Sequence, residues 1–139
     1  MANIHIGVII NGATGRMGTT QHMAHLLAIA KEGGLRLKNG DRLIPELTLV
    51  GRNADSIKAL AAAHGVKRAT TSLDEALAGP DKIFMDCSAT GGRPERVRKA
   101  IAAGKHIHIE KPTAPTVEEA MELARTLGKA MAEFRRQTT

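Results

Sequence analysis

The fold is decided by one stretch near the beginning of the chain, Ile4-His-Ile-Gly-Val-Ile-Ile10, which Asn11 joins to Gly12-Ala-Thr-Gly15-Arg-Met-Gly18. The apolar run is typical of a buried strand, and the glycine-rich segment is typical of a tight turn that opens a helix. Such a turn brings backbone N–H groups and the positive end of the helix against a pyrophosphate. We expect Gly12 to form the turn, Gly15 to let the pyrophosphate approach, and Gly18 to let the helix pack on the sheet.

Strand and helix patterns alternate along the rest of the chain. We expect strands at residues 4–10, 47–50, 66–70, 83–86 and 106–109, and helices at 16–31, 55–64, 72–79, 94–103 and from 116 onward. Strict alternation predicts an α/β fold, a Rossmann-type doubly wound parallel sheet in strand order 3-2-1-4-5, with helices on both faces in three αβα layers. We expect residues 35–45 to form a polar surface excursion. The domain is expected to span residues 1–130, followed by a polar tail at 131–139.

Composition limits the class of protein. The 139 residues suffice for one domain, whose core must be aliphatic because the chain has two Phe and no Trp or Tyr. No apolar run approaches the ~20 residues of a membrane span, and the first strand begins too early for a signal peptide. The single cysteine, Cys87, excludes an internal disulfide. We therefore expect a cytoplasmic protein without a membrane partner.

The basic character of the chain needs a separate explanation. The formal net charge is +6 and the sequence pI is about 9.9, a balance that can serve nucleic-acid binding. However, the Lys and Arg residues are scattered, and the aromatic stacking platforms of single-strand binders are missing. We expect no nucleic-acid partner, since the positive net charge is explained equally well by a domain that attracts a negatively charged dinucleotide.

The end of the second predicted strand indicates which dinucleotide binds. An NAD enzyme usually places Asp or Glu there to accept a hydrogen bond from the ribose 2′-hydroxyl. This chain instead has Val50-Gly-Arg52-Asn53. A guanidinium without a competing carboxylate suits a 2′-phosphate, which it can bind through two parallel hydrogen bonds. The alternative is that Arg52 is a solvated loop arginine. We expect NADP to be preferred, with NAD as the other candidate.

Other residues that could carry chemistry have simpler interpretations. Cys87-Ser88-Ala89 follows the fourth predicted strand and should line the crevice, but no neighbouring base would activate the thiol, which favours a packing role. His22 and His25 share one helix face, and His106 and His108 alternate with isoleucine on a strand. Two histidines without a carboxylate or cysteine set make a poor metal site, so we assign no metal.

The second motif is Glu110-Lys111-Pro112, directly after the fifth predicted strand. With it, the chain resembles the N-terminal domain of the Gfo/Idh/MocA family (glucose–fructose oxidoreductase, inositol dehydrogenase and MocA) from about residue 4 to residue 129. The resemblance includes the glycine turn and the sequence Ala102-Ala-Gly-Lys-His-Ile-His-Ile-Glu-Lys-Pro112. It implies an NAD(P)-dependent oxidoreductase that moves hydride to or from a sugar- or polyol-like alcohol or carbonyl.

The resemblance also implies roles for individual residues. Lys111 would lie beside the nicotinamide and the substrate hydroxyl as the catalytic residue, with Glu110 positioning it. Together with the glycine turn and the strand ends, the expected cofactor-binding set is Gly12, Thr14, Gly15, Arg16, Met17, Arg52, Asn53, Cys87, Ser88, Ala89, Glu110 and Lys111. Gly91-Gly-Arg-Pro94 departs from the family, which often has a Thr-Pro step there.

Only 27 residues follow Pro112 in the chain of 139, which is too few for the family's substrate domain. We therefore expect a cofactor domain that is not fully active alone. We also expect it to form a homo-oligomer through the uncovered sheet edge beyond the fifth strand and through apolar residues of the last helix around Met121, Leu123 and Leu127. Two alternatives remain open. A non-enzymatic nucleotide sensor would bind the cofactor without turnover. A dihydrodipicolinate reductase would share Gly-Ala-x-Gly-Arg-Met-Gly, although that family does not carry Glu-Lys-Pro after its fifth strand.

Overall fold

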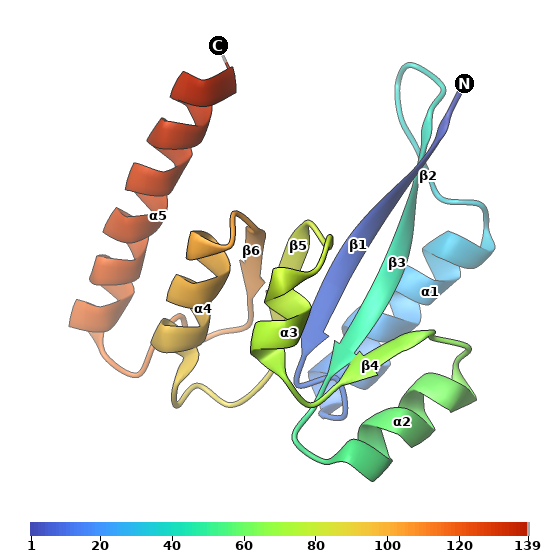
Figure 1. Ribbon diagram of the computed structural model, residues 1–139, viewed down its shortest axis with the longest axis horizontal. Coiled ribbons are helices and arrows are strands. Elements are labelled where there is room, and N and C mark those ends of the chain that lie inside the picture. The colour runs from blue at the N-terminus through green and yellow to red at the C-terminus, as the bar shows by residue number, and fades with distance from the viewer. Residues whose placement is uncertain (139) are drawn as a thin grey trace.

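Strand β1 (Asn3–Asn11) lies at the centre of a six-stranded sheet in the computed structural model, which describes residues 1–138 (Figure 1). It pairs in parallel with β3 (Arg42–Val50) on one side and with β5 (Ile83–Asp86) on the other. Beyond these strands lie β4 (Arg68–Thr70), parallel to β3, and β6 (His106–Ile109), parallel to β5. For the five predicted strands, the order 3-2-1-4-5 is confirmed.

Helices cover both faces of the sheet, as the alternation of side chains along β1 requires. Val8 and Ile10 pack on one face with Met23 of the first helical segment and with α2 (Ala54–Ala63). Ile9 and Phe84 pack on the opposite face with α3 (Leu73–Ala78) and α4 (Arg93–Ala102). The three-layer arrangement is confirmed. A third cluster joins α4 and β6 to α5 (Val117–Thr138) through Val97, Ala114 and Leu123.

The first helix departs from the prediction of one regular helix over 16–31. It begins as a π-helical segment, η1 (Met17–Met23), and continues as α1 (Ala24–Lys31). Gly18 lies at its start, where an added Cβ would be 2.6 Å from the Gly12 carbonyl oxygen. Glycine is therefore required at position 18 because the helix packs directly on the turn.

The prediction places a surface excursion at 35–45 and a short strand at 47–50, but part of that excursion is strand. Strand β3 already begins at Arg42, and β2 (Leu35–Arg36) pairs with it in antiparallel fashion to form a hairpin. The first half of β3 is not predicted from the sequence because it contains Pro45, and proline is disfavoured inside a strand. It lies between the part of β3 that pairs with β2 and the part that pairs with β4, so β3 there has β1 as its partner.

The expected polar tail at 131–139 is helical as far as the structure describes it. Helix α5 continues to Thr138, and Thr139 lies outside the described residues. Residues 131–138 are mostly good helix formers, and Arg136 pairs with Glu133 one turn earlier. No helix within residues 1–138 combines the length and apolar character needed to cross a membrane.

The turn at Gly12 has a testable requirement. Gly12 has φ +78°, and an added Cβ would lie 2.7 Å from the Ser88 backbone nitrogen. We expect Gly12→Ala to lower the free energy of unfolding by at least about 2 kcal/mol, since backbone strain and a backbone clash add together. Urea denaturation measures the loss. Gly128→Ala is the control, because Gly128 lies in α5 with open space around it and should be neutral or stabilising. Equal stability of the two variants would contradict the required turn.

Candidate cofactor-binding site

A cavity of about 470 Å³ opens at the carboxyl ends of the parallel strands. It lies beside the glycine turn, between the end of β3 and the segment that follows β5, which is where doubly wound sheets bind their ligands. The Val50 carbonyl oxygen accepts hydrogen bonds from the backbone N–H groups of Gly12 and Ala13, at 2.9 and 3.1 Å. The turn is therefore fixed to the end of β3 by the backbone.

Seven of the residues expected to bind cofactor line this cavity: Gly12, Thr14, Gly15, Arg52, Cys87, Ser88 and Ala89. An added Cβ at Gly15 would meet only the Gly12 carbonyl oxygen, at 3.3 Å. The space beside Gly15 is thus open to a ligand. The lining residues include no Asp or Glu.

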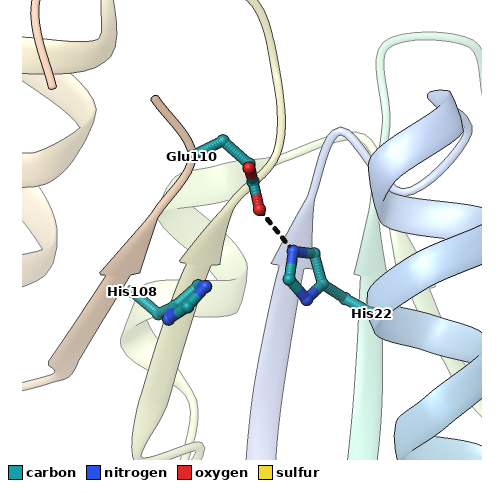
Figure 2. A group of neighbouring side chains, drawn as sticks. All are labelled: His22, His108 and Glu110. Carbon is teal, nitrogen blue, oxygen red and sulfur yellow. Dashed lines mark hydrogen bonds and ion pairs between the residues drawn. The ribbon is translucent and has the colours of Figure 1, made fainter. Parts of the chain in front are cut away.

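Five expected residues are not among those lining the cavity. Arg16 and Met17 are exposed where η1 begins, and Lys111 is exposed just after β6. Asn53 caps α2, since its side-chain oxygen accepts from the Ser56 N–H at 2.9 Å. Glu110 contacts His22, with 2.5 Å between its Oε1 and the His22 Nε2 (Figure 2). The structure therefore places the glycine turn and the segment after β5 together, and the second motif beside them.

The cavity rests on a buried ion-pair network that sequence reasoning missed. Asp86, at the end of β5, is completely buried and accepts hydrogen bonds from Nδ2 of Asn11 at 2.9 Å and Oγ of Ser88 at 2.6 Å. Its other oxygen accepts from Nε of Arg93 at 3.0 Å and from the Arg96 guanidinium at 3.1 Å. One carboxylate thus holds cavity residues from the first strand and from the loop after β5.

Arg93 extends this network to the second motif. Its side chain is 1% exposed, and its guanidinium donates to the carbonyl oxygens of Ser88, Glu110 and Pro112. The two carbonyls at 110 and 112 flank Lys111. A buried arginine therefore fixes the backbone on both sides of the lysine, which is a positioning role rather than a contact with ligand.

The network also sets the acidity of two groups. Burial alone would raise the pKa of Asp86, but hydrogen bonds from Ser88, Asn11, Arg93 and Arg96 outweigh it, so that the pKa lies below its ordinary value. Burial, with the nearby charges of Glu110 and Asp86, raises the pKa of the Cys87 thiol to about 12. Cys87 is consequently a neutral lining residue near neutral pH, in line with the packing role predicted for it.

Some of the missed residues had a detectable signal. Asn11 and Thr71 line the cavity, and both stand directly at or after strand ends, where crevice residues of parallel sheets occur. Arg93 lies in the segment that departs from the family pattern, and Arg96 lies three residues further along α4. Their burial and partners depend on how α4 packs against β5 and β6, and no local pattern in the sequence reports that packing.

Replacement of Asp86 tests the network. In Asp86→Asn the Arg93 charge stays buried without its carboxylate, which should reduce the free energy of unfolding by about 3–5 kcal/mol. The pKa of Asp86 is lowered in the folded state. Its contribution is therefore present above the ordinary carboxyl pKa near 4 and is lost as the pH falls through the lowered value. The variant should lack this part of the acid dependence, as measured by urea denaturation at several pH values.

The control for this prediction is Asp74→Asn. Asp74 pairs with Lys99 at 3.1 Å on the surface, where both side chains are well exposed, and exposed pairs contribute less than about 1 kcal/mol. A loss for Asp86→Asn as small as that of the control would show that the network is not required for stability.

Comparisons with known proteins identify the family to which this fold belongs. Residues 6–135 match the model of an oxidoreductase family with an NAD-binding Rossmann fold, GFO_IDH_MocA. D-xylose dehydrogenase of Paenarthrobacter nicotinovorans is 46% identical over 126 residues, which are 89% of this chain and 32% of that protein. An oxidoreductase domain protein from Kribbella flavida superposes with a TM-score of 0.75 at 30% identity, covering 96% of this chain and 33% of the other.

The WlbA dehydrogenase from Bordetella pertussis, solved with NADH and UDP-GlcNAcA, has a TM-score of 0.69 at 24% identity. It covers 94% of this chain and 35% of its own, and at that identity it shows likeness of fold alone. The chain spans about a third of the length of these relatives. The match over nearly the whole chain confirms the family resemblance carried by the two motifs: this chain belongs to the GFO_IDH_MocA oxidoreductase family, as its NAD-binding Rossmann domain.

Proposed function

We propose that this domain binds NADP(H) in preference to NAD(H) and serves hydride transfer to or from a sugar- or polyol-like alcohol or carbonyl. The observation that supports the cofactor preference most directly is the cavity lining, in which Arg52 is present and no carboxylate is. The Arg52 side chain makes no hydrogen bond or ion pair with another residue in the described part of the chain. It is therefore available to a 2′-phosphate.

The residues present fit a dinucleotide in other respects. The open space at Gly15 lets a pyrophosphate reach the backbone of the turn, at the positive end of the helix formed by η1 and α1. Ser88 and Ala89 follow β5, on the side toward the second motif. When bound, the nicotinamide would supply or accept the hydride, and the protein would orient it.

Lys111 is the proposed catalytic residue of this domain. Its ammonium group would donate a hydrogen bond to the substrate oxygen and assist proton transfer as that oxygen gains or loses its proton. The Arg93 hydrogen bonds to the carbonyls on either side of Lys111 support this role, because catalysis needs a lysine held in a fixed place. A sugar-like substrate is supported by the similarity to D-xylose dehydrogenase.

Self-association is a further part of the proposal. On α5, Leu127, Met131 and Phe134 follow one another at helical spacing and continue the face that begins with the buried Leu123. Met131 and Phe134 are 46% and 59% exposed. Leu123 itself packs against α4, so it is not part of an uncovered surface as the sequence suggested.

The cofactor preference is tested by titration of the purified chain with NADPH and NADH. We expect NADPH to bind more tightly, and Arg52→Ala to weaken NADPH binding by roughly ten- to a hundredfold, as loss of a charge-assisted contact implies. NADH binding should change little. Gly15→Val is the matched control, since a branched side chain at the turn should remove the binding of both cofactors while the domain stays folded. NADH binding as tight as NADPH in the unmodified protein would contradict the preference.

The self-association is tested by sedimentation of the chain and of Phe134→Glu. The unmodified chain should sediment as a dimer or a larger species, and a charge on the apolar face should return it to the monomer. Ala132→Glu adds the same charge on the other side of α5, where Ala132 is exposed, and should leave the association unchanged. A monomer at about 100 µM in the unmodified chain would contradict this part of the proposal.

A further inference from the structure

A histidine of the first helix meets the glutamate of the second motif on the face of the sheet covered by α1 (Figure 2). The Nε2 of His22 lies 2.5 Å from Oε1 of Glu110, although 88 residues separate them in the sequence. Both side chains are about four-fifths buried, with 20% and 21% exposed. A histidine and a carboxylate are thus held together in a partly desolvated place, just before Lys111.

His108 makes this pair a group of three. It precedes Glu110 by two residues on β6, so both side chains leave the sheet on the same face. Its ring lies edge-on to that of His22, with 5.3 Å between ring centroids. The potential donor atoms of His22, His108 and Glu110 all lie within 4.8 Å of one another. Within residues 1–138, neither ring nitrogen of His108 takes part in a hydrogen bond.

Two imidazoles and one carboxylate form a donor set that suits Zn²⁺ and similar divalent ions, with further positions open to water. Donor atoms around one tetrahedral ion lie roughly 3.3 Å apart, given metal–donor distances of about 2.0–2.2 Å. The group reaches that spacing if the His22–Glu110 contact opens slightly and the exposed His108 ring rotates inward. The His108 side chain is exposed and makes no hydrogen bond among the described residues.

The backbone around His22 provides an independent observation. His22 belongs to η1, the π-helical segment, and such segments occur frequently at functional sites. The next histidine on this helix, His25, lies in α1 and does not join the group. The π-helical turn therefore coincides with the one histidine of this helix that faces β6.

A second histidine–carboxylate contact in the chain serves for comparison. Nδ1 of His5 lies 2.8 Å from Oε1 of Glu46 on neighbouring strands, where both side chains are 53% exposed. No third donor joins it among the described residues. The His22 group differs from it by its burial and by the additional imidazole, and these are the properties that metal binding requires.

We propose that His22, His108 and Glu110 bind a Zn²⁺-type divalent ion beside the cofactor crevice. The ion would join the end of β6, one residue before Lys111, to the helix that follows the glycine turn. This site goes beyond the proposed dinucleotide function. None of its residues lines the cofactor cavity, although Glu110 belongs to the cofactor-binding set expected from the sequence.

The proposal is tested by calorimetric titration of the EDTA-treated chain with Zn²⁺ and, separately, with Co²⁺, whose visible absorption reports coordination by nitrogen and oxygen. We expect one ion per chain. His108→Ala should weaken binding by at least about tenfold, since even the loss of a residue that supports a ligand weakens metal sites by ten- to a hundredfold. His22→Ala and Glu110→Gln should weaken binding similarly. Zn²⁺ should also raise the melting temperature of the unmodified chain and not that of His108→Ala.

The controls separate this site from adventitious binding. His25→Ala and His5→Ala should bind Zn²⁺ as the unmodified chain does. His108 is exposed, so its replacement should leave the fold intact, and an unchanged NADH titration of His108→Ala verifies this independently of the metal. No heat and no cobalt spectrum at about 100 µM metal would overturn the proposal and leave His22–Glu110 as a simple hydrogen-bonded pair. Equal weakening in His25→Ala, or full binding by the double variant His22→Ala/His108→Ala, would overturn it as well.

Discussion

The buried pairing of Asp86 with Arg93 is the interaction on which the rest of this site depends. A charge placed fully inside a protein is tolerated only when it is paired and its remaining hydrogen-bonding capacity is used. Asp86 accepts hydrogen bonds from the first strand and from the loop after β5. Arg93 donates hydrogen bonds to the loop after β6. Loss of either charge would therefore disturb three chain segments at once.

This arrangement explains how a lysine can be exposed and still be well placed. Lys111 lies in a bend after a short edge strand, and such a segment would ordinarily move freely. The carbonyls before and after it accept hydrogen bonds from one guanidinium, which is buried and paired with Asp86. Backbone position is thus fixed from inside the protein, while the ammonium group stays accessible from outside.

Much of the fold could be predicted because its signals are local. The apolar runs, the glycine turn and the start of the helix at Ser72 each involve only a few neighbouring residues. The hairpin of β2 and β3 could not be predicted, because Pro45 fits in β3 only where neither β2 nor β4 pairs with that strand, and the sequence does not show where those pairings end. The Arg93 contacts and the His22–Glu110 pair were beyond reach for a related reason. They join segments far apart in the sequence, and a lone arginine or histidine is compatible with many surroundings.

One carbonyl at the end of β3 has a consequence for ligand length. Val50 accepts from two successive N–H groups of the glycine turn, and Gly51, the next residue, donates to Thr70 of β4 at 3.3 Å. The proposed pyrophosphate position and the residue from which the Arg52 side chain extends are therefore parts of one hydrogen-bonded backbone unit. This unit sets the spacing between the two positions that are proposed to hold phosphate groups. If NADP(H) binds as proposed, a ligand with a phosphate at only one of these positions would lose the contacts at the other, so the spacing of the phosphates would contribute to recognition.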